Sequence, residues 1–163
     1  MNATQSNLAK CATLSVTRSV RGSSMEPLFY AGDTVRVEMG SYKCSVPNRG
    51  EIVLVRFLGN EAPLLKRIRG VPGDTFAVKL LESGEGALLV NSNRLANSSG
   101  VFYHVPSARA KLWRLYQEQL HGVIPIDSFL VLGETETGSL DSSRFGFVAK
   151  GDILGKVEGR VSN

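Results

Sequence analysis

The sequence predicts a mostly β domain with one helical insertion around residues 101–122. The chain has 163 residues, enough for one domain with a sizeable core, and its 17 glycines favour a fold rich in turns. Short apolar runs of strand length alternate with turn-rich segments, a pattern typical of β structure. One stretch instead carries apolar residues at helical spacing. We therefore expect a single domain over residues 1–163, with residues 1–12 as a loose lead-in.

The first half of the chain contains the predicted strands with the clearest patterns. Residues 34–38 alternate between polar and apolar side chains, as expected of a half-buried strand. The run Ile52-Val53-Leu54-Val55 is apolar enough to be buried on both faces. Turn residues separate the strands, and a Pro-Gly-Asp turn at 72–74 closes the last of them. These strands are expected at residues 13–21, 34–38, 51–58 and 64–69.

The second half combines a hairpin, the helix and a long polar loop. Residues 76–80 and 87–91 read as a hairpin around a Gly-containing turn. The helix is expected to begin after an N-cap at Ser107 and to stop at Gly122. Its apolar stripe consists of Ala108, Leu112, Leu115, Tyr116 and Leu120, with Trp113 off the stripe. A strand at 128–132, a polar loop at 133–146 and two short strands at 147–149 and 153–157 complete the prediction.

Composition and charge exclude several classes of function. The net charge of +4 is modest and the basic residues are scattered, so no nucleic-acid partner is predicted. Cys11 and Cys44 form neither a metal-ligand pattern nor a disulfide framework, and whether they pair stays open. No metal and no cofactor are predicted.

The sequence also indicates no transmembrane segment in this chain. No run approaches the ~20 apolar residues that span a bilayer. Residues 1–13 lack the charged start and long apolar centre of a signal peptide. Two explanations stay open: the natural protein is not anchored by this chain, or an anchor has been removed ahead of Met1.

A candidate nucleophile lies in the segment Gly22-Ser23-Ser24-Met25-Glu26-Pro27. This segment follows a predicted strand, so a hydroxyl there can be presented where a substrate can reach it. Serines in turns are usually structural. The hypothesis therefore depends on whether the chain supplies a base.

Lysine is a better candidate for the base than histidine in this chain. His121 ends the predicted helix, where the macrodipole explains it, and His104 follows Tyr103 in a strand-like run, so a Ser-His-Asp triad is disfavoured. Lys66 lies in an apolar strand. Desolvation there would lower its pKa from about 10.4 and leave the neutral amine that a base requires. The strand by itself favours the alternative, in which Lys66 points outward over apolar neighbours.

A third polar segment runs from Ser139 to Gly146. Its serine, aspartate and arginine side chains could orient a lysine and brace a loop by an ion pair. The alternative is an ordinary turn held by Asx-type hydrogen bonds, which the segment in isolation favours.

Together, these segments resemble the type I signal peptidase family over roughly residues 14–157. The resemblance rests on Ser24-Met25-Glu26-Pro27, on the run from Lys66 to Asp74, and on Ser139-Leu140-Asp141-Ser142-Ser143-Arg144-Phe145-Gly146. It implies a catalytic domain of coiled antiparallel β-sheets and a serine endopeptidase with a Ser/Lys dyad. The implied substrates are preproteins with small residues at the first and third positions before the cut. The family's catalytic domain works against a membrane on the extracytoplasmic side, so a membrane surface is a further implied partner.

The resemblance also implies a role for each matching residue. Ser24 is the nucleophile, with its N–H as one oxyanion donor, and Lys66 is the general base. Ser139 hydrogen-bonds and positions the lysine, and Asp141 and Arg67 support the site. The residues expected to line the substrate groove are Met25, Leu64 and Leu65.

The chain departs from the family pattern in two places. Gly22 stands where some members carry a serine whose hydroxyl completes the oxyanion hole. In the last motif, Gly133-Glu134-Thr135 replaces Gly-Asp-Asn, Gly138 replaces an asparagine, and Ser143 replaces an arginine that pairs with the aspartate. The ion pair of Asp141 is therefore either rebuilt, with Arg144 one place later, or lost.

Other functions follow from the same residues. One is a specialised maturation peptidase with the same dyad, acting on conjugative pilins or metalloenzyme leaders. Another is a non-catalytic relative that only binds peptides, which the intact Ser24 and Lys66 argue against. Self-cleaving repressors also use Ser and Lys, but about twenty residues precede Ser24, too few for their DNA-binding domain.

Overall fold

A computed structural model describes residues 11–136 and 139–162. It confirms a mostly β chain with antiparallel sheets and a helix inside the expected insertion. Most of the expected lead-in at 1–12 lies outside the described residues, as does Gly138. The strands are β1 (Leu14–Ser19), β2 (Thr34–Met39), β3 (Ile52–Val55), β4 (Leu64–Gly70), β5 (Phe76–Leu80), β6 (Gly86–Val90), β7 (Asn93–Arg94), β8 (His104–Val105), β9 (Ser128–Leu132), β10 (Val148–Ala149) and β11 (Ile153–Arg160). The helices are α1 (Ser107–Gln119) and α2 (Ser142–Phe145), with 3₁₀ turns at Ser41–Lys43 and Lys150–Asp152.

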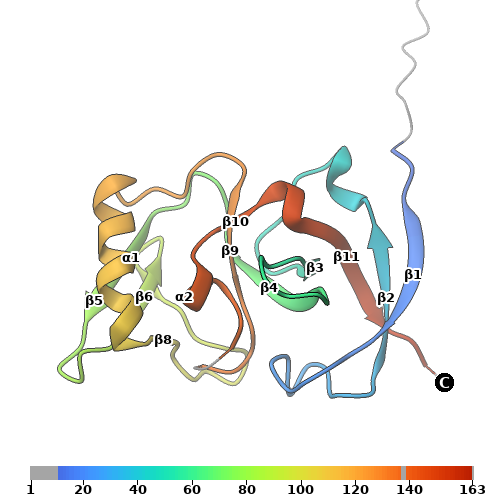
Figure 1. Cartoon of the computed structure of the whole chain (residues 1–163), viewed down its shortest axis with the longest axis horizontal. Helices are drawn as coiled ribbons and strands as arrows, with labels where there is room; N and C mark the ends of the chain where they lie inside the picture. The colour runs from blue at the N-terminus through green and yellow to red at the C-terminus, as the bar shows by residue number, and fades with distance from the viewer. Residues whose placement is uncertain (1–10, 137–138, 163) are drawn as a thin grey trace, which may run out of the picture.

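The described strands form two sheets. The larger has the order β1-β2-β11-β3-β4-β9-β10, with β1 at one edge (Figure 1). The smaller contains β5, β6 and β7, with β8 paired to β6. Helix α1 lies over the smaller sheet at the opposite end of the molecule from β1 (Figure 1).

Strand β9 joins the cores of the two sheets. Its residues Phe129 and Val131 pack into a cluster with β3 and β4. Leu130 and Leu132 pack into the cluster under α1. Successive side chains of a strand point to opposite faces, so one apolar strand can serve both cores. The chain leaves β9 directly into Gly133, and the loop that follows is therefore anchored between the sheets.

The buried face of α1 differs from the predicted stripe. Ala108 and Leu115 are exposed, whereas Ala110 and Trp113 are buried, with Tyr116 packed beside them. Trp113 packs edge-on against Phe76 and Phe147, and this large side chain decides which side of the helix faces the sheet. The N-cap is Pro106 rather than Ser107.

Three other boundaries also differ from prediction. The strand expected at 51–58 pairs only over Ile52–Val55. The helix ends at Gln119, so His121 follows it instead of ending it. The polar loop at 133–146 contains the short helix α2, which Asp141 caps by accepting a hydrogen bond from Ser143 N.

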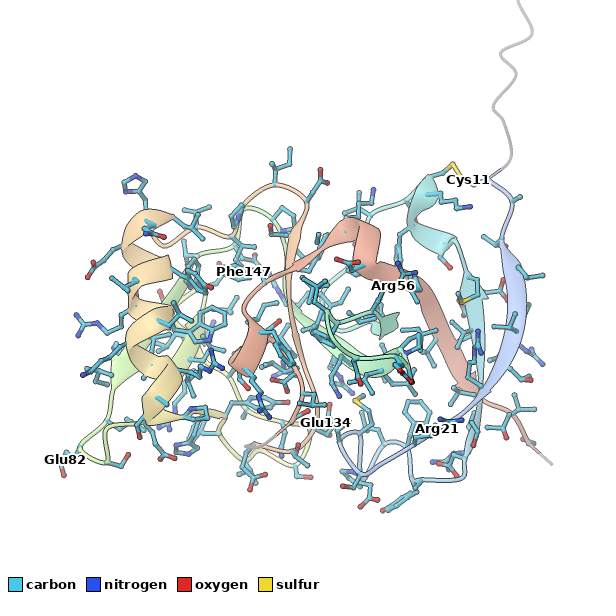
Figure 2. The ribbon with its side chains drawn as sticks, viewed as in Figure 1. Cys11, Arg21, Arg56, Glu82, Glu134 and Phe147 are labelled. Atoms are coloured by element: carbon cyan, nitrogen blue, oxygen red, sulfur yellow. A yellow bond between two sulfur atoms is a disulfide. The ribbon has the colours of Figure 1, made fainter. Side chains whose placement is uncertain are left out.

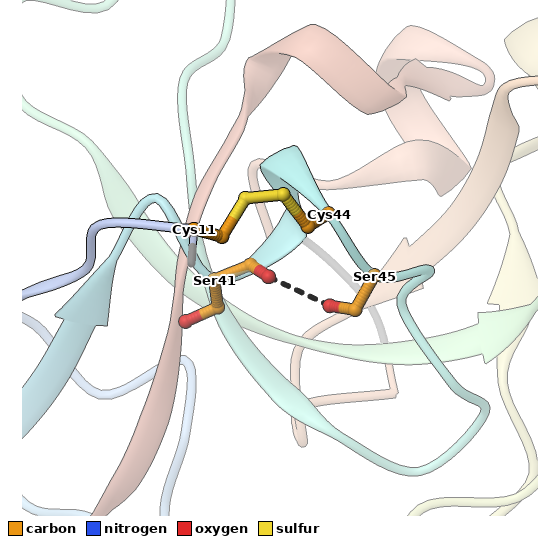
Figure 3. The surroundings of a disulfide bond; sticks show 4 residues. All are labelled: Cys11, Ser41, Cys44 and Ser45. Atoms are coloured by element: carbon orange, nitrogen blue, oxygen red, sulfur yellow. Dashed lines mark hydrogen bonds between the residues drawn. A yellow bond between two sulfur atoms is a disulfide. The ribbon is translucent and has the colours of Figure 1, made fainter. Parts of the chain in front are cut away.

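Cys11 and Cys44 form a disulfide, which settles the pairing that the sequence left open (Figure 3). The bond ties the start of β1 to the loop after β2, across a sequence separation of 33 residues. Ser45 Oγ, next to Cys44, donates to Ser41 O at 2.6 Å. No helix in the described part of the chain is both long enough and apolar enough to cross a membrane.

Candidate active site

A hydrogen-bonded turn after β1 fixes the position of Ser24. Glu26 N donates to Ser23 O at 3.0 Å, and Phe29 N donates to Met25 O at 3.0 Å. The side chain of Met25 is buried in a cluster with Val35 and Leu54, which holds the turn against the larger sheet. The Ser24 side chain remains partly exposed beside this anchor.

Lys66 points inward from β4, so the alternative of an outward lysine is wrong. Alternation along β4 places Lys66 on the same face as Ile68, and both side chains are 0% exposed. Lys66 Nζ lies 2.7 Å from Ser24 Oγ. Burial lowers the pKa of Lys66 to about 8, although the charge of Asp141 opposes part of this shift. A neutral amine is therefore accessible near neutral pH, next to a hydroxyl.

Ser139 lies close to this pair without the hydrogen bond to lysine that was predicted. It lines a cavity of about 340 Å³ together with Ser24 and Lys66. Its hydroxyl is buried and has no hydrogen-bond partner among the described residues. The Lys66 amine makes its hydrogen bond with Ser24 instead.

Asp141 is held by hydrogen bonds in place of the ion pair with arginine. Its carboxylate accepts from Gly133 N at 2.9 Å, from Ser143 N at 2.9 Å and from Ser143 Oγ at 2.6 Å. Arg144 makes no ion pair with it in the described structure. Ser143, which replaces the family's arginine, thus supplies two donors to the same carboxylate. Hydrogen bonds from neutral groups therefore replace the ion pair of Asp141.

Glu134 is a site residue that the sequence did not predict. In the sequence it stands out only as a difference from the family motif. Its carboxylate is buried, and Oε1 lies 3.2 Å from Arg67 Nε. Its other oxygen accepts from Ser98 N at 2.9 Å. Its own N–H donates to Ser24 O at 2.6 Å. An acid directly after an apolar strand was the available signal, because a buried carboxylate needs partners.

Glu134 therefore connects three parts of the structure. It joins the serine turn, the strand that carries Lys66 and the loop at Ser98. Figure 2 shows Glu134 between the two sheets, with Arg21 farther toward the β1 side of the molecule. Arg67, predicted as a supporting residue, lies in this network through Glu134.

Gly133 lies where the backbone passes close to Ser24. A Cβ at this position would stand 2.7 Å from both Ser24 O and Ser139 Oγ. The hydroxyl of Tyr103 donates to Gly133 O and holds the segment from the other side. Burial raises the pKa of Tyr103, so this hydroxyl keeps its proton.

We expect the Gly133→Ala variant to lose both stability and the Ser24–Lys66 geometry. The added methyl would collide with the Ser24 carbonyl, which is backbone and cannot rotate away. Overpacking of this kind costs about 1–3 kcal/mol in free energy of unfolding. Thermal denaturation measures the cost. Gly151→Ala is the matched control, because its Cβ would meet no atom within 4 Å and its φ is not in the left-handed region.

A groove of about 300 Å³ adjoins Ser24 on its other side. The three residues predicted to line a substrate groove, Met25, Leu64 and Leu65, all line it together with Ser24. The opposite wall is formed by residues 17–21 at the end of β1. The sequence-predicted residues of two separate segments are thus brought to one groove.

The Ser24 N–H is available as a hydrogen-bond donor. It makes no hydrogen bond to any other residue that the structure describes. Gly22 adopts a φ of +70° and contributes no side-chain donor. A backbone amide at the nucleophile is therefore the donor that this side of the site offers to a developing oxyanion.

Comparison with known proteins places the whole described chain in one family of sequences. The family model described as "Signal peptidase, peptidase S26" matches residues 4–162. The probable signal peptidase I-2 of Synechocystis is 31% identical over 146 residues, which is 86% of this chain and 60% of that protein. Signal peptidase I of Leptolyngbya laminosa is 30% identical over 148 residues, 86% of this chain and 65% of that protein.

Two further matches also cover most of this chain. Signal peptidase IB of Staphylococcus aureus (strain COL) is 30% identical over 153 residues, 87% of this chain and 75% of that protein. A crystal structure of a signal peptidase I from Enterococcus faecalis matches with a TM-score of 0.44 and 25% identity, over 72% of this chain and 98% of that one. This chain spans 60% and 65% of the lengths of the cyanobacterial relatives.

Proposed function

The chain belongs to the signal peptidase family, peptidase S26, and we propose that it is a serine endopeptidase that cleaves N-terminal signal or leader peptides from preproteins after small residues. One observation carries this proposal: the Ser24 hydroxyl lies 2.7 Å from the amine of a fully buried lysine, Lys66. A nucleophile paired with a base whose pKa is lowered is the arrangement that acyl transfer needs.

In the proposed mechanism, the neutral amine of Lys66 takes the proton of Ser24 as Oγ attacks the scissile carbonyl. The Ser24 N–H stabilises the oxyanion of the tetrahedral intermediate. The protonated Lys66 then gives its proton to the leaving amine, and an acyl-enzyme forms on Ser24. Water activated by the neutral Lys66 hydrolyses this ester and returns the serine.

The surrounding residues position this pair. The charge of Asp141 partly opposes the fall in the Lys66 pKa, and its carboxylate also fixes Gly133. Glu134 links the Ser24 carbonyl to Arg67, the neighbour of Lys66. Ser139 lies on the cavity next to the lysine, and we propose that it hydrogen-bonds the amine when Ser24 is acylated.

The substrate binds as an extended peptide in the groove beside Ser24. Met25, Leu64 and Leu65 form its apolar lining. Strand β1 is at a sheet edge, so one side of its backbone has no strand partner in the described structure and can accept an added strand.

The disulfide supports an extracytoplasmic location. Disulfides form and persist in oxidising compartments, and Cys11–Cys44 is formed in this structure. We propose that the domain acts outside the cytoplasm at a membrane surface, where preproteins emerge.

Cleavage of a short peptide tests the proposed function. We expect a peptide with Ala at the first and third positions before the central bond to be cut after the first of these residues. Mass spectrometry of the two fragments identifies the bond. A matched peptide with Phe at both positions should resist cleavage. If both peptides are cut equally, the proposed specificity is wrong, and if neither is cut the peptidase assignment is wrong.

We also expect the activity to rise with pH through about 8. The active form carries a neutral Lys66, and the pKa of Lys66 is lowered to about 8 by burial. Below that pH, protonated lysine cannot accept the serine proton, so kcat/KM should fall about tenfold per unit. Initial rates measured between pH 6 and 10 give the apparent pKa. A profile that stays flat from pH 6 to 9 would contradict Lys66 as the base.

The lowered pKa of Lys66 also makes the free energy of unfolding depend on pH. The folded pKa of Lys66, about 8, lies below its ordinary value of 10.5, so the unfolded chain binds more protons between these values. The contribution of Lys66 to the free energy of unfolding therefore rises as pH increases from about 8 to 10.5.

A further inference from the structure

Arg18 occupies a core-facing position of β1 yet lies in the groove. In the antiparallel pair of β1 and β2, Val16 lies opposite Val37 and Arg18 opposite Val35. Val35 and Val37 are both fully buried in the cluster that holds the serine turn. Opposite residues share a face of the sheet, so Arg18 points to the same side as these valines. It is nevertheless exposed, and it lines the groove with Leu64 and Leu65.

No acidic side chain of the described residues balances the positive charge of this groove. Arg18 and Arg21 both line it, and no acidic side chain does. All acidic residues of the chain lie within the described ranges, and none of them forms an ion pair with either arginine. Glu26 and Glu61 adjoin lining residues in the sequence but do not line the groove themselves. A guanidinium beside an apolar wall is a binding group for a carboxylate.

We propose that Arg18 is a specificity-determining residue that binds an acidic side chain of the substrate, on the amino-terminal side of the cut. This inference rests on the proposed function and narrows its substrate class. The preferred substrates carry Asp or Glu near a small residue at the cleavage site. Arg21 lies nearer Ser24 along the chain and adds to the positive potential of the groove.

The strand geometry limits where that acid can be. Alternate side chains of an extended peptide point to the same side and repeat about every 6.6 Å. If the small residue at the first position faces the groove, the third and fifth positions face it as well. Arg18 lies on the same face of the chain as Val20 and is two residues farther from Ser24 along the sequence. The proposed function reserves the third position for a small residue, so we expect the acid at the fifth position and not at the second or fourth.

A series of peptides tests the proposal. The parent peptide has Ala at the first and third positions, and a single Asp is placed at the second, fourth, fifth or sixth position, each with an Asn counterpart. For the unaltered protein, we expect kcat/KM to favour Asp over Asn about fivefold at the fifth position, which is the size of a partly exposed charge pair. The Arg18→Gln variant should lose this Asp/Asn ratio, and Arg18→Glu should favour Lys at the same position.

Arg36→Gln is the matched control. Arg36 is on β2 opposite Thr17, is exposed and points to the other face of the same sheet. The Arg36→Gln substitution removes one positive charge from the same sheet, at a residue that does not line the groove. Its Asp/Asn ratio should equal that of the unaltered chain. An equal loss in both variants would mean a general effect of net charge and would overturn the assignment to Arg18, as would equal rates for Asp and Asn at every position.

Binding separates this inference from the proposed function. Fluorescence anisotropy with the Ser24→Ala variant measures the affinity for labelled peptides without cleavage. A peptide with Asp that binds about fivefold more tightly than its Asn counterpart, and does so only while Arg18 is present, supports the inference even if no peptide is cut. Cleavage with equal affinities for the two peptides supports the peptidase and rejects the role of Arg18.

Discussion

The Lys66→Met variant is expected to lose peptide cleavage by roughly 10³-fold or more while keeping its fold. Methionine has a similar length and can follow the buried path of the lysine stem, but it cannot accept a proton. Loss of a positioned general base costs about 10²–10⁴-fold, and in the proposed mechanism Lys66 also activates the water for deacylation. Initial rates on the Ala-containing peptide measure the effect.

The stability of the same variant separates loss of chemistry from loss of structure. A buried amine is costly to desolvate, so its replacement by an apolar side chain should leave the melting temperature unchanged or raise it. The Ser24→Ala variant should be equally inactive, because it lacks the proposed nucleophile, whose hydroxyl lies 2.7 Å from this amine. Normal cleavage by either variant at an unchanged melting temperature would show that another residue carries the reaction.

The Glu134→Gln variant is expected to be destabilised and to lose activity. Glutamine keeps the shape but removes the negative charge that lies 3.2 Å from Arg67 Nε, and Arg67 is itself only partly exposed. Breaking a fully buried pair by removing one partner costs about 3–5 kcal/mol, and the 21% exposure of the Arg67 side chain places the expected loss below this range. Because the same segment binds the Ser24 carbonyl, we also expect kcat to fall more than KM rises. Chemical denaturation and steady-state kinetics provide the two measurements.

Glu136→Gln is the matched control for this prediction. It makes the same substitution two residues further along the loop, at an exposed side chain. We expect it to leave both the free energy of unfolding and kcat within error of the unaltered chain. Equal effects of the two substitutions would indicate that the loop responds to net charge and not to the Glu134–Arg67 pair.

Much of the fold could be predicted because local patterns decide it. The period-two alternation of residues 34–38 and the apolar run at 52–55 each identify a strand, since a sheet with a buried face dictates that pattern. The helix was predicted for the same reason, but its buried face was not. Trp113 packs between α1 and Phe76, and only the position of the sheet relative to the helix determines that contact.

The sequence by itself determined the family, the mostly β class and the set of candidate residues, because these depend on residue types at fixed spacings. Only the tertiary structure decided that Lys66 points inward, because strand alternation offers two faces and the packing of the sheet selects one. The tertiary structure also pairs Cys11 with Cys44 and gives Asp141 a hydrogen bond from Ser143 in place of an ion pair with arginine. It places Glu134 in contact with three separate segments. These contacts join residues far apart in the chain, and no local pattern encodes the distance between them.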